Sequence, residues 1–428
     1  MSDAVWKEQF GKVKQLAPLG ISLVREPPDE ALDPSFVYQE NHILMRANLS
    51  LTHQALARLN ARPVPFTDGT PIPVGDFGQP RLLKVDIPAG STVLDVIPEL
   101  NQAFGPRMFA PNHLMSICPV NLCPGDEPLP PPSVQPKPRY VAGDAGRGVS
   151  VRVIDTGLVN GYDAHPWMGP PITGDVTTVV GEIPPYRPHG TFIAGVLRCV
   201  APATTLRVTN ELSWAGAVME DALANAVLKA LNESPAPQII SLSAGSTTFD
   251  GLAPMAFEPV FEKLRQPGCT TLLVAAAGND GLPHPFWPAA QHVHQPQAVI
   301  SVGALNEDRT GHACFTNYGP WVRVFESGER LVNAFATGAY KYIEPPSAIC
   351  RYYNPALYPN CTCVGGPSPG STKDFEGLAQ WSGTSFATPF IVGRIAKHMT
   401  DTANANPRAA AQSLLLGTPV GGQLPAWT

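Results

Sequence analysis

Short apolar runs alternate with helical patterns from about residue 149 to the end of the chain. The runs are rich in β-branched residues and apolar on both faces, which is typical of strands buried in a parallel sheet. The predicted strands are 149–154, 206–209, 238–242, 271–276 and 299–302. Helical spacing is clearest at 217–231 and 389–399. Strands separated by helices predict a parallel sheet covered on both sides, with functional groups at the carboxyl ends of its strands.

The first third of the chain has a different pattern, in which two helical segments are interleaved with strand-like ones. Strands are predicted at 42–51, 81–87 and 108–117, and helices at 51–59 and 92–104. This order predicts a small α+β domain over residues 1–123. Proline-rich sequence at 124–141 predicts an extended linker outside any packed core. The larger domain then occupies 142–428.

Composition and charge narrow the classes of function. The 428 residues include 29 Lys and Arg against 35 Asp and Glu, a formal net charge of −6, and no basic block offers a footprint for nucleic acid. We find no apolar run long enough to span a bilayer and no secretory signal, so we predict a cytoplasmic protein without a membrane partner. The eight cysteines lack the C-x-x-C spacing of zinc sites, which predicts free thiols and no bound metal.

An aspartate and a histidine stand at two promising positions in the larger domain. Asp155 closes the strand 149–154 in the sequence Asp-Thr-Gly, where a partly buried carboxylate can orient an imidazole. The same motif also occurs as a turn, as a helix cap and in aspartic proteases. His189 stands in PHGTFIAG, whose small residues let the chain pack closely as it enters a helix. Its imidazole can act as general base to a hydroxyl, although a histidine beside glycine is also commonly a capping or core residue.

A serine and an asparagine complete the set of candidate catalytic residues. Ser385 stands in SGTSFATP just before the helical run, where a serine often serves as a helix cap. The same place puts its own amide and the helix dipole where an oxyanion would form. Asn279 follows Ala-Ala-Ala-Gly at the end of a buried strand, which points an amide donor out of the sheet. The alternative for Asn279 is an Asn-Asp-Gly turn.

Taken in order, the motifs Asp-Thr-Gly, His-Gly-Thr, Ala-Ala-Gly-Asn and Gly-Thr-Ser-x-Ala-Thr-Pro resemble those of the subtilisin (subtilase) family over residues 149–402. The resemblance implies an α/β fold with a subtilisin-like parallel sheet flanked by helices. It also implies a serine endopeptidase that hydrolyses peptide bonds of protein or peptide substrates through an acyl-enzyme intermediate. In that family Asp155 would orient the imidazole, His189 would be base and acid, Ser385 the nucleophile, and Asn279 with Ser385 the oxyanion hole.

Two further segments resemble the substrate-binding parts of the family. Ser243, Ala244 and Gly245 end a predicted strand and are similar to the segment that pairs with the main chain of an extended substrate. Phe286 and Trp287 are similar to the stretch that walls the primary specificity pocket. A plain core strand and a proline turn are the alternatives for these two segments.

The sequence also departs from the family pattern. Phe192 stands where many relatives carry a second histidine, and an insert at 335–381 lengthens the chain between Asn279 and Ser385. The insert contains the tyrosines Tyr340, Tyr342, Tyr352, Tyr353 and Tyr358 and the cysteines Cys350, Cys361 and Cys363. We predict a lid or a docking surface for a protein partner there, with a solvated decoration as the alternative. No cofactor is predicted. Calcium, common in relatives, stays an open alternative, although no acidic cluster in the sequence can be assigned to it.

The α+β domain at 1–123 fits the family pattern of an inhibitory propeptide with β-α-β-β-α-β order. Residues 109–117 resemble the tail of such a propeptide, which would lie in the active-site cleft as an intramolecular inhibitor. We therefore predict a zymogen that cleaves itself between about residues 117 and 141 and has a regulated processing role. An unrelated accessory domain is the alternative.

Three other classes of protein compete with a serine endopeptidase. A catalytically silent, protein-binding module on the same fold would use the tyrosine-rich insert. An acid peptidase of the sedolisin type would require a glutamate in place of His189, and its activity would peak at strongly acidic pH. An α/β-hydrolase is disfavoured because the context of Ser385 lacks Gly-x-Ser-x-Gly.

Overall fold

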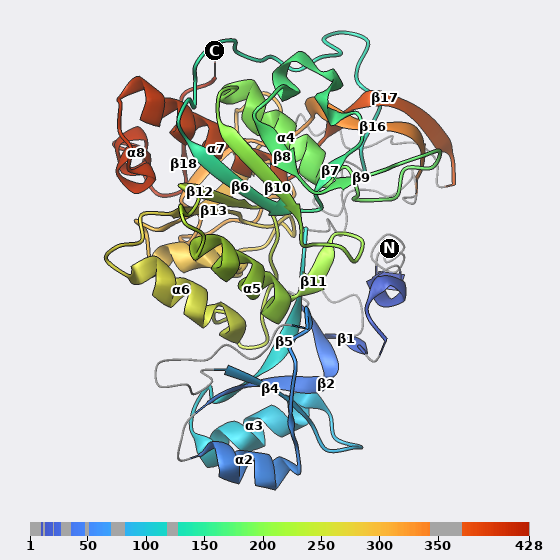
Figure 1. The fold of residues 1–428 in the computed structure, drawn as a ribbon, viewed down its shortest axis with the longest axis vertical. Helices are drawn as coiled ribbons and strands as arrows, with labels where there is room; N and C mark the ends of the chain where they lie inside the picture. Colours follow the sequence, from blue (N-terminus) through green and yellow to red (C-terminus); the bar gives the residue numbers. More distant parts are fainter. Residues whose placement is uncertain are drawn as a thin grey trace.

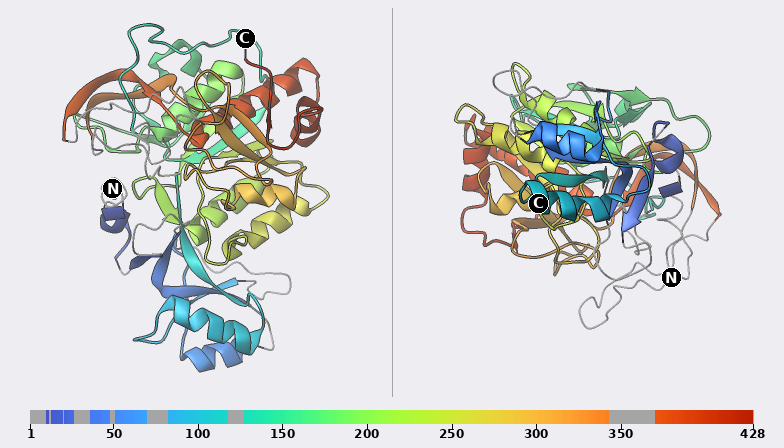
Figure 2. Two further views of the ribbon diagram at one scale, coloured as in Figure 1. Left: turned by 180° about the vertical axis from the view of Figure 1, so that it is seen from behind. Right: turned by 90° about the horizontal axis from the view of Figure 1, so that it is seen from below.

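The computed structural model describes residues 10–11, 13–19, 21–26, 36–47, 51–69, 82–117, 127–342 and 370–427. Figure 1 shows two units that follow one another along the long axis of the molecule. A small N-terminal unit ends at residue 117, and a larger main unit begins at residue 127. Seen from below in Figure 2, the helices of the N-terminal unit lie in front of the main unit. No helix in the described part of the chain is both long and apolar enough to cross a membrane.

An eight-stranded sheet, parallel throughout, forms the centre of the main unit. Its spatial order is β18 (Gly422–Gln423), β15 (Val324–Ser327), β14 (Val299–Leu305), β13 (Leu272–Ala276), β12 (Ile239–Leu242), β6 (Ser150–Asp155), β10 (Thr205–Asn210) and β8 (Ile172–Gly174). All five strands predicted from apolar runs are in this sheet. The predicted α/β class with a parallel central sheet is therefore confirmed.

Helices cover both faces of this sheet, which explains why its strands are apolar on both faces. One face packs against α4 (His189–Val200) and α7 (Thr384–Asp401), and the other against α5 (Glu220–Leu231) and α6 (Glu258–Arg265). Strand β6 shows the alternation, since Val151 and Val153 belong to the first core cluster and Ile154 to the second. The short helix α8 (Pro407–Leu414) packs against α7 near the C-terminus.

The N-terminal unit has its own antiparallel sheet and its own core. Its elements are β1 (Leu23–Glu26), β2 (Phe36–Arg46), α2 (Thr52–Leu59), β3 (Pro63–Val64), β4 (Leu82–Asp86), α3 (Val93–Phe104) and β5 (Phe109–Ser116). Helix α3 begins where the Thr92 side chain accepts a hydrogen bond from the amide of Asp95. Both predicted helices of this region are present, and from β2 onward the elements follow the expected β-α-β-β-α-β order.

The prediction of a helix at 217–231 is wrong for its first three residues. Ala217–Met219 forms strand β11, which extends the sheet of the N-terminal unit by pairing antiparallel with β5. The helix begins only at Glu220. Pairing with a distant strand therefore overrides the helical periodicity of these three residues.

The helix predicted at 389–399 is longer than expected, because α7 begins at Thr384 and has Pro389 inside it. A proline has no N–H, so the carbonyl of the residue four positions earlier loses its helical partner. That carbonyl belongs to Ser385, and it accepts a hydrogen bond of 2.8 Å from the Ser243 hydroxyl instead. The helix thus continues through the proline with a side chain in place of the missing amide.

Part of the predicted linker is packed rather than free. Leu129 forms an antiparallel bridge to Gln380, and the Glu127 side chain is buried. Both contact a hairpin of β16 (Leu331–Lys341) and β17 (Thr372–Trp381), which the sequence pattern did not predict. The hairpin binds this stretch through two tyrosines, since Tyr340 donates a hydrogen bond to Glu127 and Tyr342 donates to the carbonyl of residue 128.

The hairpin of β16 and β17 also bears on the docking surface predicted for the insert at 335–381. Tyr340 and Tyr342 are both 2% exposed, so they support the fold and are not available to a docking partner. The other three tyrosines and the three cysteines of the insert lie outside the described residues. Among the described cysteines, Cys199, Cys269 and Cys314 are free thiols, as predicted.

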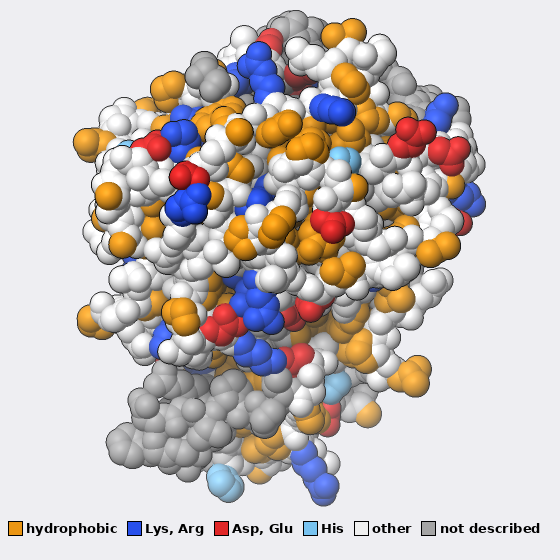
Figure 3. All heavy atoms as spheres, turned by 45° about the horizontal axis from the view of Figure 1, so that its top comes forward, with side chains coloured by type: hydrophobic (Ala, Val, Ile, Leu, Met, Phe, Trp, Pro, Cys, Tyr) orange, Lys and Arg blue, Asp and Glu red, His pale blue; other side chains and the backbone are white. Residues whose placement is uncertain are grey.

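Basic and acidic side chains are interspersed on the face drawn in Figure 3, so neither sign of charge dominates that face.

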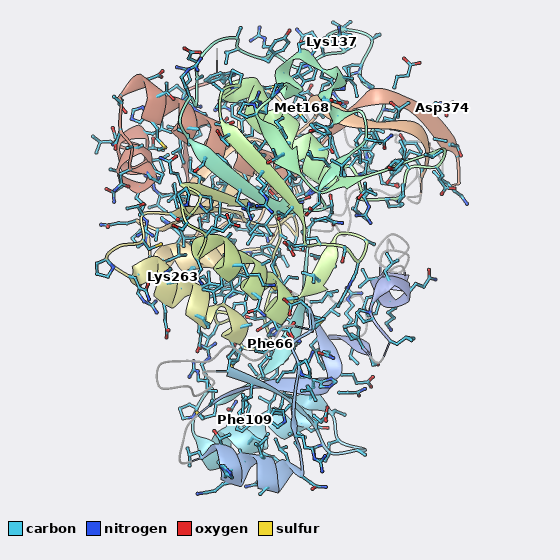
Figure 4. All side chains as sticks on the ribbon, viewed as in Figure 1. Phe66, Phe109, Lys137, Met168, Lys263 and Asp374 are labelled. Carbon is cyan, nitrogen blue, oxygen red and sulfur yellow. The ribbon has the colours of Figure 1, made fainter. Side chains whose placement is uncertain are left out.

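The N-terminal and main units meet through an apolar contact. Figure 4 labels Phe66, which lies at this junction and belongs to the same core cluster as Leu223 of α5.

Candidate active site

Asp155 and His189 come from neighbouring elements and are in direct contact. Asp155 ends β6 and His189 begins α4, and 2.8 Å separates the Asp155 Oδ1 from the His189 Nδ1. Both side chains are buried, and Asp155 Oδ1 also accepts the amide of Thr156 at 2.8 Å. A hydrogen on Nδ1 that faces the carboxylate leaves Nε2 of the neutral ring free to accept a proton. The pair is thus oriented as a general base requires.

Two glycines allow this approach. A Cβ on Gly190 would lie 2.3 Å from the carbonyl oxygen of Gly157, which no side chain tolerates. The Thr156 hydroxyl accepts the amide of Gly190 at 3.0 Å and so joins the two motifs directly. The Asp-Thr-Gly and His-Gly-Thr motifs therefore lock β6 against the start of α4, which fixes the carboxylate relative to the imidazole.

Ser385 is the second residue of α7, and the ring of the next residue, Phe386, lies 5.3 Å from the His189 ring. The Ser385 hydroxyl donates to the carbonyl of Ser243 at 3.4 Å. Within the described residues no hydrogen bond joins this hydroxyl to His189. Catalytic hydrogen bonds are often long or misaligned before substrate binds, so the missing bond does not exclude a nucleophile–base pair.

Asn279 lies directly after β13 and is held by the first residue of α7. Its Oδ1 accepts hydrogen bonds from both the amide and the hydroxyl of Thr384, each 2.8 Å long. This fixes the orientation of the amide group, and its Nδ2 lies on the side of Gly383, 3.4 Å from the position of a Cβ there. A donor held in this way beside the helix start of the nucleophile suits a developing oxyanion.

The segment after β12 lies beside the same helix start. Ser243 bonds to Ser385 as described above, and Gly245 pairs with the end of β5. The amide of Ser116 donates to the Gly245 carbonyl at 3.0 Å and the amide of Gly245 donates back to the Ser116 carbonyl at 2.9 Å, while the amide of Ile117 donates to the Gly216 carbonyl at 2.8 Å. The tail of the N-terminal unit is therefore held as an extended strand between two segments of the main unit.

Phe286 and Trp287 lie on the other side of Gly245. Ser246 and Trp287 form an antiparallel bridge, and the Phe286 ring is in contact range of Gly245 and Gly278. The structure thus brings all nine predicted site residues into one region: Asp155, His189, Ser385, Asn279, Ser243, Ala244, Gly245, Phe286 and Trp287.

Sequence reasoning missed one neighbour of the imidazole, Trp381. Its ring lies edge-on to His189, with centroids 5.5 Å apart, and also packs against Phe192. Phe192 in turn packs against Phe386, with ring centroids 4.4 Å apart. The sequence feature that could have identified Trp381 is its position four residues before Ser385. Burial raises the pKa of the Cys199 thiol, ten residues after His189 in α4, to about 12, so this thiol stays protonated.

Two acidic residues at the start of α5 bind the N-terminal unit. Glu220 Oε2 accepts the amide of His113 at 3.1 Å and also contacts the His113 ring, and its Oε1 accepts the amide of Ala256 at 3.0 Å. Asp221 accepts both the amide and the hydroxyl of Thr67 at 2.8 Å. Both carboxylates are buried, and the helix dipole favours negative charge at this end of α5.

Comparison with known proteins agrees with this geometry. The family model described as the Subtilase family matches residues 146–423. The chain therefore belongs to the subtilase family.

Curated relatives are distant. The chain is 28% identical over 213 residues to the thermophilic serine proteinase of Bacillus sp. (strain AK1), which covers 47% of this chain and 49% of that protein. It is 28% identical over 269 residues to the intracellular serine protease of Paenibacillus polymyxa, with coverage of 59% and 66%. The chain thus spans about half to two-thirds of the length of these relatives.

Among solved structures, fervidolysin from Fervidobacterium pennivorans, a keratinolytic enzyme related to subtilisin, matches 90% of this chain and 60% of its own with a TM-score of 0.55. Its sequence identity of 16% supports the shared fold alone.

Proposed function

We propose that the chain is a serine endopeptidase in which Asp155, His189 and Ser385 form the catalytic triad and Asn279 donates to the oxyanion. The observation that carries the proposal is the buried contact between Asp155 and His189 beside the start of α7. Membership of the subtilase family supports it. The substrate is a protein or peptide bound as an extended strand along Ser243–Gly245.

The reaction follows from the geometry. His189 Nε2 takes the proton of the Ser385 hydroxyl as its oxygen attacks the scissile carbonyl, and the Asp155 carboxylate stabilises the imidazolium that forms. The Asn279 amide and the amide of Ser385 donate to the oxyanion. The imidazolium then protonates the leaving amine, and a water activated by the same ring hydrolyses the acyl-enzyme.

We further propose that the N-terminal unit is an intramolecular inhibitor and that the enzyme is made as a self-processing zymogen. Ser116 and Ile117 occupy the strand position that a substrate would take beside Gly245 and Gly216. Cleavage is expected between about residues 117 and 141. Because the inhibitor covers the cleft until it is cleaved and released, this arrangement suits a regulated processing role.

The proposed inhibition predicts a role for Glu220. Replacing it with glutamine (Glu220→Gln) removes the charge that binds the His113 amide and ring in a buried site. Truncating or neutralising one partner of a buried charged hydrogen bond costs about 2–5 kcal/mol, so the cleaved N-terminal unit should inhibit at least about thirtyfold more weakly. The measurement is the inhibition constant of the N-terminal unit against processed enzyme.

A matched control is Glu258→Gln. Glu258 forms an ion pair with Arg46 across the same interface, but both side chains are about one-third exposed, at 31% and 34%. Exposed pairs contribute about 0.2–1 kcal/mol, so the inhibition constant should change less than about fivefold. Equal effects of the two variants would contradict a specific role for Glu220.

Covalent labelling tests the proposed activity. A fluorophosphonate probe reacts with an activated serine, so it should modify Ser385 and leave the Ser385→Ala variant unlabelled. Peptide mapping by mass spectrometry identifies the modified residue.

A second candidate function is a catalytically silent binding module. The observation in its favour is that the Ser385 hydroxyl is bonded to the Ser243 carbonyl and not to His189. A protein of this kind would take up no fluorophosphonate at Ser385 and would cleave no peptide, while still binding its own N-terminal unit.

A further inference from the structure

Phe286 fills the gap between two chain segments that flank the nucleophile. Strands β12 and β13 are neighbours in the sheet, and the segments that follow them contain Gly245 and Gly278. A Cβ on Gly245 would lie 2.4 Å from Phe286 Cε1, and a Cβ on Gly278 would lie 2.9 Å from Phe286 Cγ. The ring thus contacts both segments and is only 5% exposed.

The neighbouring residues hold the ring in place. Trp287 pairs with Ser246 through two main-chain hydrogen bonds of 2.9 and 2.8 Å, which fixes the chain next to Phe286. On the far side, Asn317 donates to the Ala277 carbonyl at 2.9 Å and fixes the segment that carries Gly278. Phe286 also belongs to a buried cluster with Ala275, Ala276 and Ala277. The ring is therefore part of a packed wall.

The register of the bound strand shows which substrate residue meets this ring. Ser116 pairs antiparallel with Gly245. In an antiparallel pair, a peptide residue two positions after the one opposite Gly245 lies opposite Ser243. Ser243 is hydrogen bonded to Ser385 in both directions, so the residue opposite Ser243 carries the carbonyl nearest the nucleophile. A side chain of that residue that points into the protein enters the gap between the segments of Gly245 and Gly278.

We propose that Phe286 closes the primary specificity pocket and restricts the residue on the acyl side of the cleaved bond to glycine, alanine or serine. The inference rests on the proposed endopeptidase function and names its substrate class. A larger side chain meets the Phe286 ring, and the main-chain hydrogen bonds of the substrate cannot form in register without displacing it. The substrates of this site are therefore peptides with a small residue at the scissile carbonyl.

The test uses the full chain, after incubation for self-processing, and a set of peptides that differ only in the residue before the scissile bond: Gly, Ala, Leu or Phe. The wild type should give a kcat/KM for Ala at least about a hundredfold above that for Leu or Phe, since a single misfit methylene in a pocket already changes kcat/KM by about 10–200-fold. The Phe286→Ala variant should raise kcat/KM for the Leu and Phe peptides at least about tenfold and leave that for Gly nearly unchanged.

Two further variants keep the result interpretable. Phe286→Val removes less of the buried side chain, so it should fold if Phe286→Ala does not, and it should shift the preference in the same direction by a smaller factor. Phe249→Ala removes an aromatic ring four residues beyond Gly245, in a loop that contacts Phe36 of the N-terminal unit, and it should keep the wild-type ranking. Wild type that cleaves after Phe as well as after Ala, or a folded Phe286 variant with unchanged ranking, overturns the proposal.

Binding separates this inference from the proposed catalysis. The same peptides are titrated against Ser385→Ala and against Ser385→Ala combined with Phe286→Ala, and their relative affinities are compared. Both proteins also carry Glu220→Gln, because their uncleaved N-terminal unit must leave the substrate position before a peptide can bind. If wild type hydrolyses no peptide but the affinity order changes from small to large residues between these variants, the pocket assignment holds and the endopeptidase assignment fails. If the affinity order does not change, the pocket assignment fails whatever the turnover.

Discussion

Replacing Ser385 with alanine should lower kcat on a peptide substrate by about a millionfold, which is the loss measured when the nucleophile is removed from subtilisin itself. In the proposed mechanism this hydroxyl supplies the atom that attacks the carbonyl. The measurement is the initial rate of peptide cleavage, with circular dichroism to show that the variant is folded.

Two companion variants make this prediction specific. Removing His189 as well as Ser385 should give no further loss, because residues of a triad act as a unit and their effects do not add. Ser382→Ala is the matched control: its hydroxyl accepts the amide of Arg330 at 2.9 Å, and its loss should change kcat less than about threefold. A Ser385→Ala protein that retains even a hundredth of the wild-type rate would refute the assignment of the nucleophile.

The second large effect is expected at Asn279. Asn279→Asp keeps an oxygen for the amide and hydroxyl of Thr384, both 2.8 Å away in the wild type, but replaces the Nδ2 donor by an acceptor. We expect kcat to fall by about 10²–10³ with KM nearly unchanged, the magnitude found for the same donor in subtilisin, because the donor acts on the oxyanion and not on the bound substrate.

Asn306→Asp is the control for this substitution. The Asn306 side chain organises a turn by accepting the amide of Gly311 and donating to the Thr310 hydroxyl, both at 3.1 Å. Its kcat should stay within about twofold of wild type. An Asn279→Asp enzyme with an unchanged kcat would show that the oxyanion is stabilised by other donors.

The sequence carried most of the information about the central sheet and the candidate site. Each of the four motifs combines a chemical residue with small neighbours, and the structure explains the need: Gly157 and Gly190 must approach closely before Asp155 can contact His189. Buried strands such as β13 are apolar on both faces, so they can be recognised in the sequence as short apolar runs.

The errors arose where long-range contacts decide local structure. Ala217–Met219 has helical periodicity but pairs with β5, about a hundred residues earlier in the chain. The proline-rich stretch near residue 127 was predicted to be free, yet Tyr340 binds Glu127 from more than two hundred residues away. Burial and the neighbouring Glu127 raise the pKa of Tyr340 well above its ordinary value, so this hydroxyl remains a donor even at a pH that ionises an exposed tyrosine. No local sequence pattern predicts either of these two contacts.

The most direct test of the account is an intact-mass time course of the full-length chain at neutral pH, run beside the Ser385→Ala variant. We predict that the wild type splits between residues 117 and 141 while the variant stays intact, which would establish a working serine nucleophile and self-processing together. Two results would contradict self-processing by Ser385. In the first, both proteins stay intact and neither cleaves an added peptide; in the second, both proteins are cut at the same bond.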